Sequence, residues 1–275
     1  MITCFGEVLI DCLPSGDVIG GAPFNVAINL KKLGNEVDFI SQIGNDKYGK
    51  LILDLAQKQS IANNIQQSDE KATGTVSVTF EDGEPQYTIN TDRAWHAIDH
   101  INLSYKPSHF VFGSLATFTP FVKETFSKYY QENSESVFVC DLNIRKPFIS
   151  NEHILFCLNH CSILKINEDE WTTLEQLFSL TEQALVEYIF NQFGINHIIL
   201  TLGSKGAKII TPKETVYKHP PLINEENFKD PIGAGDGFLA SYLHHYTNSG
   251  NMENSLNEAL KYASLICQNK GAILP

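Results

Sequence analysis

The stretch NVAINLKKLGNEVDFISQIGNDKYGKLILDLAQKQ, residues 25–59, contains the repeating unit of the fold. Its first part, NVAINLKKLG, has apolar residues at the spacing of a helix, and Gly34 marks the end of that helix. VDFISQIG has the length of a buried strand, and KYGKLILDLAQKQ is helical again. Helix, strand and helix in this order indicate an α/β fold.

The same alternation extends in both directions from this stretch. ITCFGEVLID at the N-terminus reads as a first strand, and later segments with the same character are HFVFGSL, SVFVCDLN, CSILKIN and HIILTLG. Segments of helical length separate these runs from one another. The sequence therefore predicts a parallel sheet with helices on both faces.

One segment departs from this alternation. Residues 73–89, TGTVSVTFEDGEPQYTI, alternate with period two about an EDG turn, which predicts a β-hairpin. Because a hairpin cannot easily join a parallel core, we expect it in a separate small sheet beside the main domain. Flaps of this kind often cover an active site. No linker divides the chain, so we expect a single domain over residues 1–275.

Composition and charge exclude several classes of protein. Hydrophobic residues make up 43% of the 275 residues and charged residues 19%, as in ordinary globular proteins, and no apolar run could span a bilayer. The net charge of −12 argues against a nucleic-acid partner, which would require a basic face. The N-terminus reads as a strand rather than a signal peptide, and the six cysteines form no C-x-x-C pair. We therefore expect a cytoplasmic protein with reduced cysteines and no membrane partner.

Residues 230–243, DPIGAGDGFLASYL, combine a loop of small residues with the start of a helical pattern. Because Gly233, Ala234 and Gly235 have little or no side chain, their backbone N–H groups can turn toward a ligand. The start of the helix adds partial positive charge, so this loop predicts an anion site. Asp236 places a carboxylate at the mouth of that site.

This loop differs from the common nucleotide-binding loops. The dinucleotide fingerprint requires a third glycine where this chain has Phe238, and no further strand and helix follow the loop. The chain also has no G-x-x-x-x-G-K-[ST] segment. NAD binding and P-loop chemistry are therefore both disfavoured.

A second candidate site segment, GGAPFN, begins at Gly20. Asn25 lies at the start of the predicted helix, where it could cap the helix or bind a polar ligand. Asp11 ends the predicted first strand. Since open α/β sheets bind ligands beyond the carboxyl ends of their strands, Asp11, Asn25 and Asp236 could converge there. Carboxylate and amide side chains suit the paired hydroxyls of a polyol or sugar.

These segments together resemble the ribokinase-like carbohydrate kinase family, of the phosphofructokinase-B type. The two family signatures correspond to residues 20–49 and to DPIGAGDGF, and supporting motifs lie at residues 141–145, 165–170 and 201–207. GEVLID together with GGAPFNVA is most similar to the fructokinase subgroup. The resemblance implies a three-layer α/β/α sandwich with a mainly parallel central sheet. It also implies a small β-sheet lid formed by about residues 9–20 and 62–97.

The resemblance implies transfer of the γ-phosphoryl group of ATP to a sugar hydroxyl. Asp236 would act as the base toward that hydroxyl, and the N–H groups of the 233–235 loop would form the anion hole. Asp11, Gly21 and Asn25 would bind the sugar. The helix start favours an ionised Asp236 and burial opposes it, and we expect ionisation to win near neutral pH.

Further binding positions follow from the same resemblance. The residues expected to bind the nucleotide are Asn167, Thr201, Gly203, Gly206, Gly233 and Gly235. Glu170 would hold Mg²⁺, partly through water. Asp230 and the carbonyl group of Ile232 would hold a monovalent cation, K⁺. Pro231 stands where the family usually has threonine, and Gly237 where it has serine or alanine.

Only two of the 20 cationic residues are arginines. Arg145 lies in the D-x-N-x-R motif, and Arg93 follows the hairpin beside Trp95. Because a guanidinium forms planar two-pronged hydrogen bonds that lysine cannot, we expect Arg93, Trp95 and Arg145 to face the substrate.

The sequence leaves several candidates for the acceptor sugar. Fructose is the favoured acceptor, and ribose, another furanose, a nucleoside and 2-keto-3-deoxygluconate are alternatives. A sugar acid would require a further cation in the pocket. The alternative from another class is a catalytically silent sugar-binding or sensing protein. Pairing of lids between subunits would give a homodimer.

Overall fold

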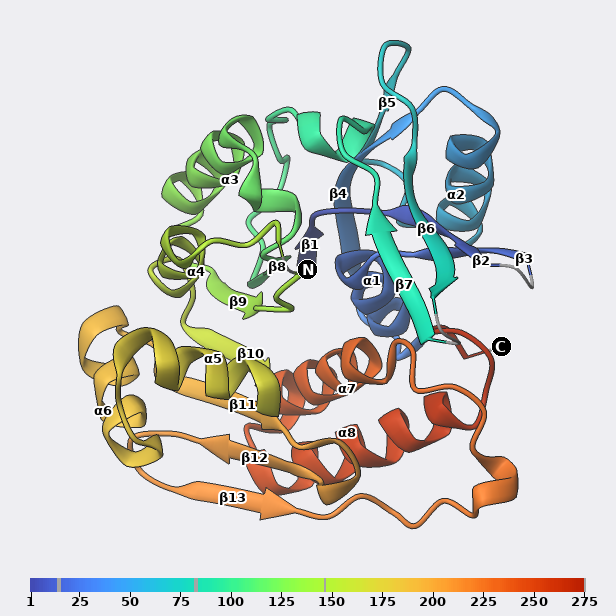
Figure 1. Ribbon diagram of the computed structural model, residues 1–275. Helices are drawn as coiled ribbons and strands as arrows, with labels where there is room; N and C mark the ends of the chain where they lie inside the picture. The colour runs from blue at the N-terminus through green and yellow to red at the C-terminus, as the bar shows by residue number, and fades with distance from the viewer. Residues whose placement is uncertain (14–15, 82–83, 146, 275) are drawn as a thin grey trace.

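The computed structural model describes residues 1–13, 16–81, 84–145 and 147–274. A central sheet of nine strands runs through the molecule (Figure 1). In sheet order the strands are β13 (Thr215–Lys218), β12 (Ala207–Ile210), β11 (His197–Thr201), β10 (Ile163–Asn167), β9 (Val137–Asp141), β8 (His109–Gly113), β1 (Ile2–Phe5), β4 (Val37–Gly44) and β5 (Ile65–Ser68). The seven strands from β11 to β5 pair in parallel, and β12 and β13 extend one edge antiparallel.

In the described part of the chain, eight α-helices cover the two faces of this sheet. They are α1 (Ala22–Lys32), α2 (Lys47–Lys58), α3 (Pro120–Glu132), α4 (Asn151–Leu158), α5 (Glu168–Phe178), α6 (Glu182–Phe193), α7 (Ala234–Ser249) and α8 (Met252–Cys267). One buried cluster contains residues of α1, α2, α7 and α8, and the other contains residues of α3, α4, α5 and α6. The described chain therefore forms the predicted three-layer α/β/α sandwich.

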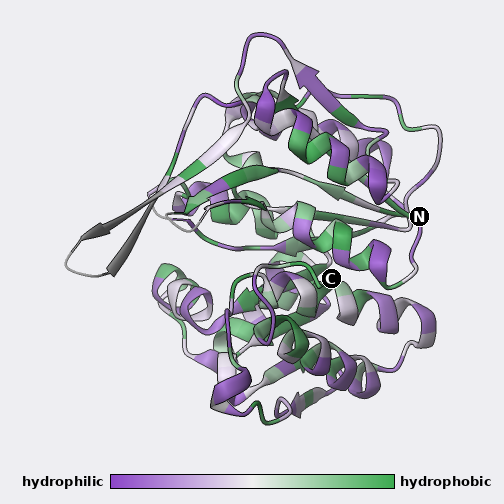
Figure 2. Cartoon of the chain, turned by 90° about the vertical axis from the view of Figure 1, so that its right-hand side faces the viewer, coloured by the Kyte–Doolittle hydropathy of each residue, from purple (hydrophilic) through white to green (hydrophobic). Residues whose placement is uncertain are grey.

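The strands alternate their side chains between these two layers. In β8, Phe110 and Phe112 join one buried cluster and Val111 joins the other. Figure 2 shows the hydrophobic strands between helices that carry both hydrophobic and hydrophilic residues. Within the described residues, none of the helices is both long and apolar enough to cross a bilayer.

A second sheet of four strands lies beside the main one, in the order β3 (Gly16–Gly20), β2 (Leu9–Leu13), β6 (Gly74–Glu81) and β7 (Glu84–Ile89) (Figure 1). The antiparallel pair β6–β7 confirms the predicted hairpin and its separation from the parallel core. Residues 82–83 of the predicted turn lie outside the described residues. The small sheet is mixed, because β2 pairs in parallel with β6 and antiparallel with β3.

The prediction that ITCFGEVLID forms one strand is wrong. The chain changes direction at Gly6, whose φ of 147° lies in a region that favours glycine. A Cβ at this position would lie 2.7 Å from Cγ of Pro23 in α1, so the glycine also permits close packing. The chain therefore leaves the main sheet after β1 and enters the small sheet as β2. Asp11 consequently lies on the small sheet and not at the carboxyl end of a main-sheet strand.

Candidate functional site

The loop before α7 is built as the sequence predicts. Gly233 caps the helix with φ 77° and ψ −1°, a left-handed conformation that glycine adopts at little cost. The N–H of Ala234 donates to the carbonyl of Pro231 at 3.1 Å. Contrary to the prediction, this N–H is therefore not available to an anion. Among the described residues, the N–H groups of Gly233, Gly235 and Asp236 have no backbone acceptor. These three amides are the donors that the helix start can present to a ligand.

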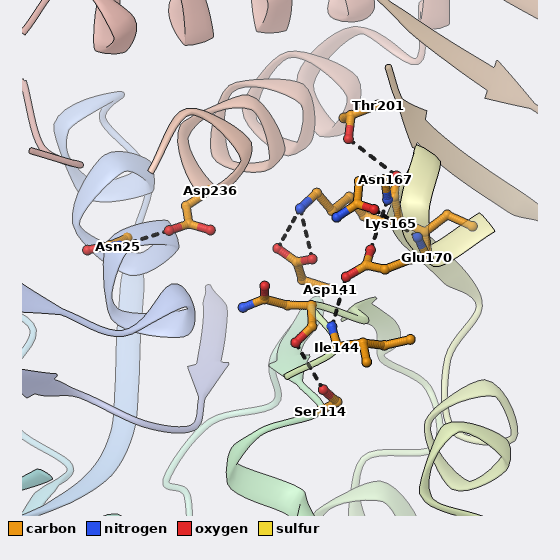
Figure 3. A network of polar contacts seen from close by, with 11 residues as sticks. Asn25, Ser114, Asp141, Ile144, Lys165, Asn167, Glu170, Thr201 and Asp236 are labelled. Carbon is orange, nitrogen blue, oxygen red and sulfur yellow. Dashed lines mark hydrogen bonds and ion pairs between the residues drawn. The ribbon is translucent and has the colours of Figure 1, made fainter. Parts of the chain in front are cut away.

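The side chain of Asp236 contacts the other signature segment directly. Asn25 Nδ2 donates to Asp236 Oδ2 at 2.8 Å, across a separation of 211 residues in the sequence (Figure 3). Asn25 lies within α1 and does not cap it, because Gly21 holds the capping position. Its Oδ1 is buried and has no partner among the described residues. Asn25 thus orients the carboxylate and keeps one acceptor available for a hydroxyl group.

The segment around Gly21 brings the small sheet close to α1. A Cβ on Gly21 would lie 2.5 Å from the carbonyl oxygen of Glu7, and a Cβ on Gly20 would lie 2.4 Å from Asp11 Oδ2. Burial raises the pKa of Asp11, and the positive charge of Arg145 opposes that rise. The charge of Arg145 also lowers the pKa of Asp236. The structure therefore brings Arg145 within electrostatic range of both carboxyl groups.

A buried ion pair lies beside this group. Lys165 Nζ donates to both carboxylate oxygens of Asp141, at 2.9 and 3.0 Å (Figure 3). Asp141 ends β9 and Lys165 lies in β10, in direct register with it. A Cβ on Gly235 would lie 3.2 Å from Lys165 Nζ, so the ammonium group lies against the anion loop.

Asn167 and Glu170 form a capping box at the start of α5. The N–H of Glu170 donates to Asn167 Oδ1, and the N–H of Asn167 donates to Glu170 Oε2, both at 2.9 Å. Glu170 Oε1 accepts a further hydrogen bond from the N–H of Ile144 at 2.8 Å. Both residues thus have a structural role at the carboxyl end of β10. A carboxylate oxygen has a second lone pair, which is compatible with a water-mediated contact to Mg²⁺.

The other predicted nucleotide-binding residues lie at the same edge of the sheet. Thr201 ends β11 directly opposite Asn167, and its hydroxyl donates to the carbonyl of Ile166 at 3.3 Å. Gly203 begins a short 3-10 helix, Gly203–Lys205, and Gly206 follows it with φ 116°. These positions form a turn, and their contact with a nucleotide stays a prediction.

The residues predicted to hold a monovalent cation join the loop to the C-terminal segment. Asp230 Oδ1 accepts from the N–H of Ile232 at 2.9 Å, and Oδ2 accepts from the N–H of Gly271 at 3.4 Å. Gly237 is also explained by packing, since a Cβ there would lie 2.0 Å from Cδ1 of Ile266 in α8. The cation itself stays a prediction.

Arg93 and Trp95 lie at the base of the small sheet. Trp95 is fully buried in the short helix η1 (Ala94–Ala97), and a Cβ on Gly74 would lie 2.5 Å from its indole ring. The N–H of Arg93 donates to Nδ1 of His96 at 2.9 Å. Their described contacts do not extend to Asp236, so their role in substrate binding stays a prediction.

The charges at the site favour a bound cation. The carboxyl groups that interact there are Glu7, Asp141, Glu170 and Asp236, and the cationic groups are Lys165 and Arg145. Burial raises the pKa of Glu7, Asp141 is paired with Lys165, and Asp236 accepts from Asn25, so Glu170 is the carboxylate that suits a hard cation. Among the described residues, no group of three or more His, Cys, Asp or Glu side chains could hold a metal ion. The residues present therefore fit an Mg²⁺ held by Glu170, water and the phosphates, as predicted for Glu170.

A family model described as pfkB family carbohydrate kinase matches residues 4–275. The chain belongs to the pfkB family of carbohydrate kinases. Fructokinase-2 of Oryza sativa subsp. japonica is 27% identical over 307 aligned residues, which cover 100% of this chain and 90% of the relative.

Solved structures of sugar kinases have the same fold. Fructokinase with bound ATP from Xylella fastidiosa gives a TM-score of 0.86 at 19% identity, covering 98% of this chain and 93% of that chain. The sugar kinase PH1459 from Pyrococcus horikoshii in complex with ATP gives a TM-score of 0.81 at 25% identity, covering 99% of this chain and 94% of that chain. A putative Ribokinase II from E. coli gives a TM-score of 0.84 at 20% identity, covering 99% of this chain and 94% of that chain. These neighbours confirm the ribokinase-like fold.

Three charged residues at this pfkB-family site were not among the candidates selected from the sequence. They are Glu7, Asp141 and Lys165, which are 2%, 3% and 7% exposed. The available signal was a charged residue within a strongly apolar strand pattern, as in ITCFGEVLID and CSILKIN. Since buried charges are rare unless they are paired or functional, this pattern could have identified them.

Glu7 lies where the chain passes from the main sheet to the small sheet. Its Oε2 is buried and has no partner among the described residues. Burial raises the pKa of Glu7 to about 8; Asp236 and Asp141 add to the rise, whereas the backbone N–H of Glu7 and the charge of Arg145 oppose it. Glu7 is therefore mostly protonated at neutral pH.

Replacing Glu7 with Gln is expected to stabilise the fold increasingly as pH rises. Between its ordinary pKa of 4.5 and its folded value of about 8, Glu7 is ionised in the unfolded chain and protonated in the folded one. Folding of the original protein then takes up a proton, so its free energy of unfolding falls by up to about 1.4 kcal/mol for each unit of rising pH. Glutamine does not titrate, so the variant does not have this loss of stability.

Denaturant unfolding at about pH 5 and about pH 8.5 measures the difference between the two proteins. Glu124→Gln, at an exposed ion pair on α3, is the matched control. A Glu7→Gln difference that stays constant over this range would show that the pKa of Glu7 is not raised.

Proposed function

We propose that the protein is an ATP-dependent fructokinase, which transfers the γ-phosphoryl group of ATP to D-fructose and yields fructose 6-phosphate. The observation that carries this proposal is the hydrogen bond from Asn25 to Asp236. It joins the two signature segments of the family and places an amide suited to sugar hydroxyls beside a carboxylate suited to act as a base.

In this proposal, Asp236 orients the sugar hydroxyl and takes its proton as the oxygen attacks the γ-phosphorus. Burial raises the pKa of Asp236 to about 6, so the carboxyl group is mostly ionised at pH 7. The N–H groups at the start of α7 would stabilise charge on the transferred phosphoryl group. Asp11 and the free Oδ1 of Asn25 would bind other sugar hydroxyls.

The nucleotide would lie along the carboxyl ends of β10 and β11, beside Asn167, Thr201 and the turn that contains Gly203 and Gly206. Glu170 would hold Mg²⁺ partly through water. The bound ion supplies positive charge that neutralises the phosphate oxygens. Asp230 and the carbonyl of Ile232 would hold K⁺ near the loop.

The charge of the site favours a neutral sugar over a sugar acid. Arg145 already interacts with the carboxyl groups of Asp11, Asp236 and Glu7. A substrate carboxylate would therefore compete with several protein carboxylates for one guanidinium group. A homodimer through the small sheet and a cytoplasmic location stay predictions.

The test is ADP release with Mg·ATP against fructose, ribose, 2-keto-3-deoxygluconate and a nucleoside. We expect the highest kcat/KM with fructose. A higher value with another acceptor would replace fructose and leave the mechanism in place. Sugar binding without turnover on any acceptor would favour the sugar-sensing alternative.

A further inference from the structure

The ion pair of Lys165 and Asp141 lies between the predicted base and the predicted nucleotide site. Lys165 Nζ uses two of its three N–H groups on the Asp141 carboxylate. Both residues are almost completely buried, and the pair joins adjacent strands at the edge where the signature motifs meet. An ion pair removed from water in this way adds little to stability, because the cost of desolvation offsets the attraction.

The surroundings of the pair connect it to Asp236. Lys165 Nζ lies against Gly235, the residue that precedes Asp236 in α7. Burial lowers the pKa of Lys165, but the carboxylates of Asp141, Glu170 and Asp236 together outweigh burial and raise it. Lys165 therefore stays charged, and it acts electrostatically on groups from β9, α5 and α7. Figure 3 shows its side chain directed toward Asp141 on the side of the site where α7 begins.

We propose that Lys165 and Asp141 are positioning residues that set the charge state of Asp236, with Lys165 favouring the ionised base and Asp141 opposing it. This inference rests on the proposed role of Asp236 as the base. The pair would hold the base ionised near neutral pH without making it so weak that it cannot accept a proton.

Some of the groups around Asp236 raise its pKa, and others lower it. Burial is the largest cause of its raised pKa, and Asp141 on β9 raises it further. Lys165 on β10, the hydrogen bond from Asn25 on α1 and Arg145 after β9 lower the pKa. Glu7, between β1 and β2, interacts with Asp236 as well but is mostly protonated at neutral pH. Glu170 on α5 acts on Lys165.

Removing either partner should therefore shift the titration of Asp236 in opposite directions. Lys165→Met is expected to raise the midpoint by about one pH unit, and Asp141→Asn is expected to lower it by about one unit. In the double variant the two shifts should largely cancel. The double variant also leaves no unpaired buried charge, which keeps the test available if a single variant folds poorly.

The first measurement is a ¹³C NMR titration of the protein labelled at the aspartate carboxyl carbons, without substrate. The Asp236 signal is assigned by its loss in Asp236→Asn. Lys208→Met is the control, because Lys208 on β12 of the same sheet forms a partly exposed ion pair with Glu182 of α6. The second measurement is the acid limb of kcat/KM against pH, which should move with the NMR midpoint.

The outcomes distinguish this inference from the proposed function. Opposite shifts of the NMR midpoint, with none in Lys208→Met, would support the inference even if the acceptor sugar is not fructose. A midpoint that stays fixed in the folded variants, or that moves the same way in both, would overturn it. Opposite NMR shifts with an acid limb that does not move would show that Asp236 is not the base and would overturn the positioning role as well.

Discussion

Replacing Asp236 with Asn is expected to lower kcat by about 10² to 10⁴-fold, the usual contribution of a general base. The variant keeps the shape of the side chain, and its carbonyl oxygen can still accept the hydrogen bond from Asn25. It removes the group that takes the proton. Because the buried carboxylate is itself unfavourable, as its raised pKa shows, the substitution should not destabilise the fold.

Steady-state ADP release and ATP binding by calorimetry separate the two effects of this substitution. We expect ATP affinity to change little, since Asp236 is expected to contact the acceptor rather than the nucleotide. Asp54→Asn is the control, because Asp54 lies in an exposed ion pair on α2. An Asp236→Asn enzyme with more than one tenth of the original kcat, roughly, would remove Asp236 from the role of base.

Much of the fold could be predicted because its signals are local. Continuous apolar runs identified buried parallel strands, and period-two alternation identified the hairpin of the small sheet. The start of α7 followed from the small residues of GAGD and the apolar spacing after them. Each of these features depends on residues within one turn or one strand of each other.

The features that could not be predicted depend on contacts across the chain. Gly6 divides an apparently continuous strand, and its reason is the close packing of Pro23 against it. Ala234 loses its free N–H to Pro231, a detail of loop geometry. The Asn25–Asp236 contact joins residues 211 positions apart. The rule for ligand sites in open α/β sheets placed the two residues in one region, but it could not predict the hydrogen bond between them.

The convergence of Asn25 and Asp236 was predicted, but the buried charges beside them were not. Lys165 lies in the apolar strand β10 and Glu7 in the apolar connection between β1 and β2. The pattern there favours burial, and burial normally excludes an ionisable side chain. An ionisable residue within an apolar pattern therefore indicates a charge that the chain retains although burial makes it unfavourable. Such charges often mark functional sites, and here they lie around Asp236.

The second large effect is expected from Gly233→Ala, at the cap of α7. Gly233 has φ 77°, and a Cβ there would lie 2.1 Å from the Cβ and 2.4 Å from the Cα of Ala272. The alanine must therefore adopt a strained backbone and also displace the C-terminal segment or the start of the helix. Because the reacting groups must be held closely, a displacement of about 1 Å should lower kcat by about 10²-fold.

Gly250→Ala separates the backbone strain from this close contact. Gly250 ends the same helix with φ 66°, and no atom lies within 4 Å of the position of its Cβ. The free energy of unfolding of Gly250→Ala should fall by about 1 kcal/mol, the cost of an alanine in a left-handed backbone conformation, and kcat should not change. Gly233→Ala should lose more stability in urea and also lose turnover. If both variants lost equal stability and both kept full kcat, the contact with Ala272 would not be what positions the anion loop.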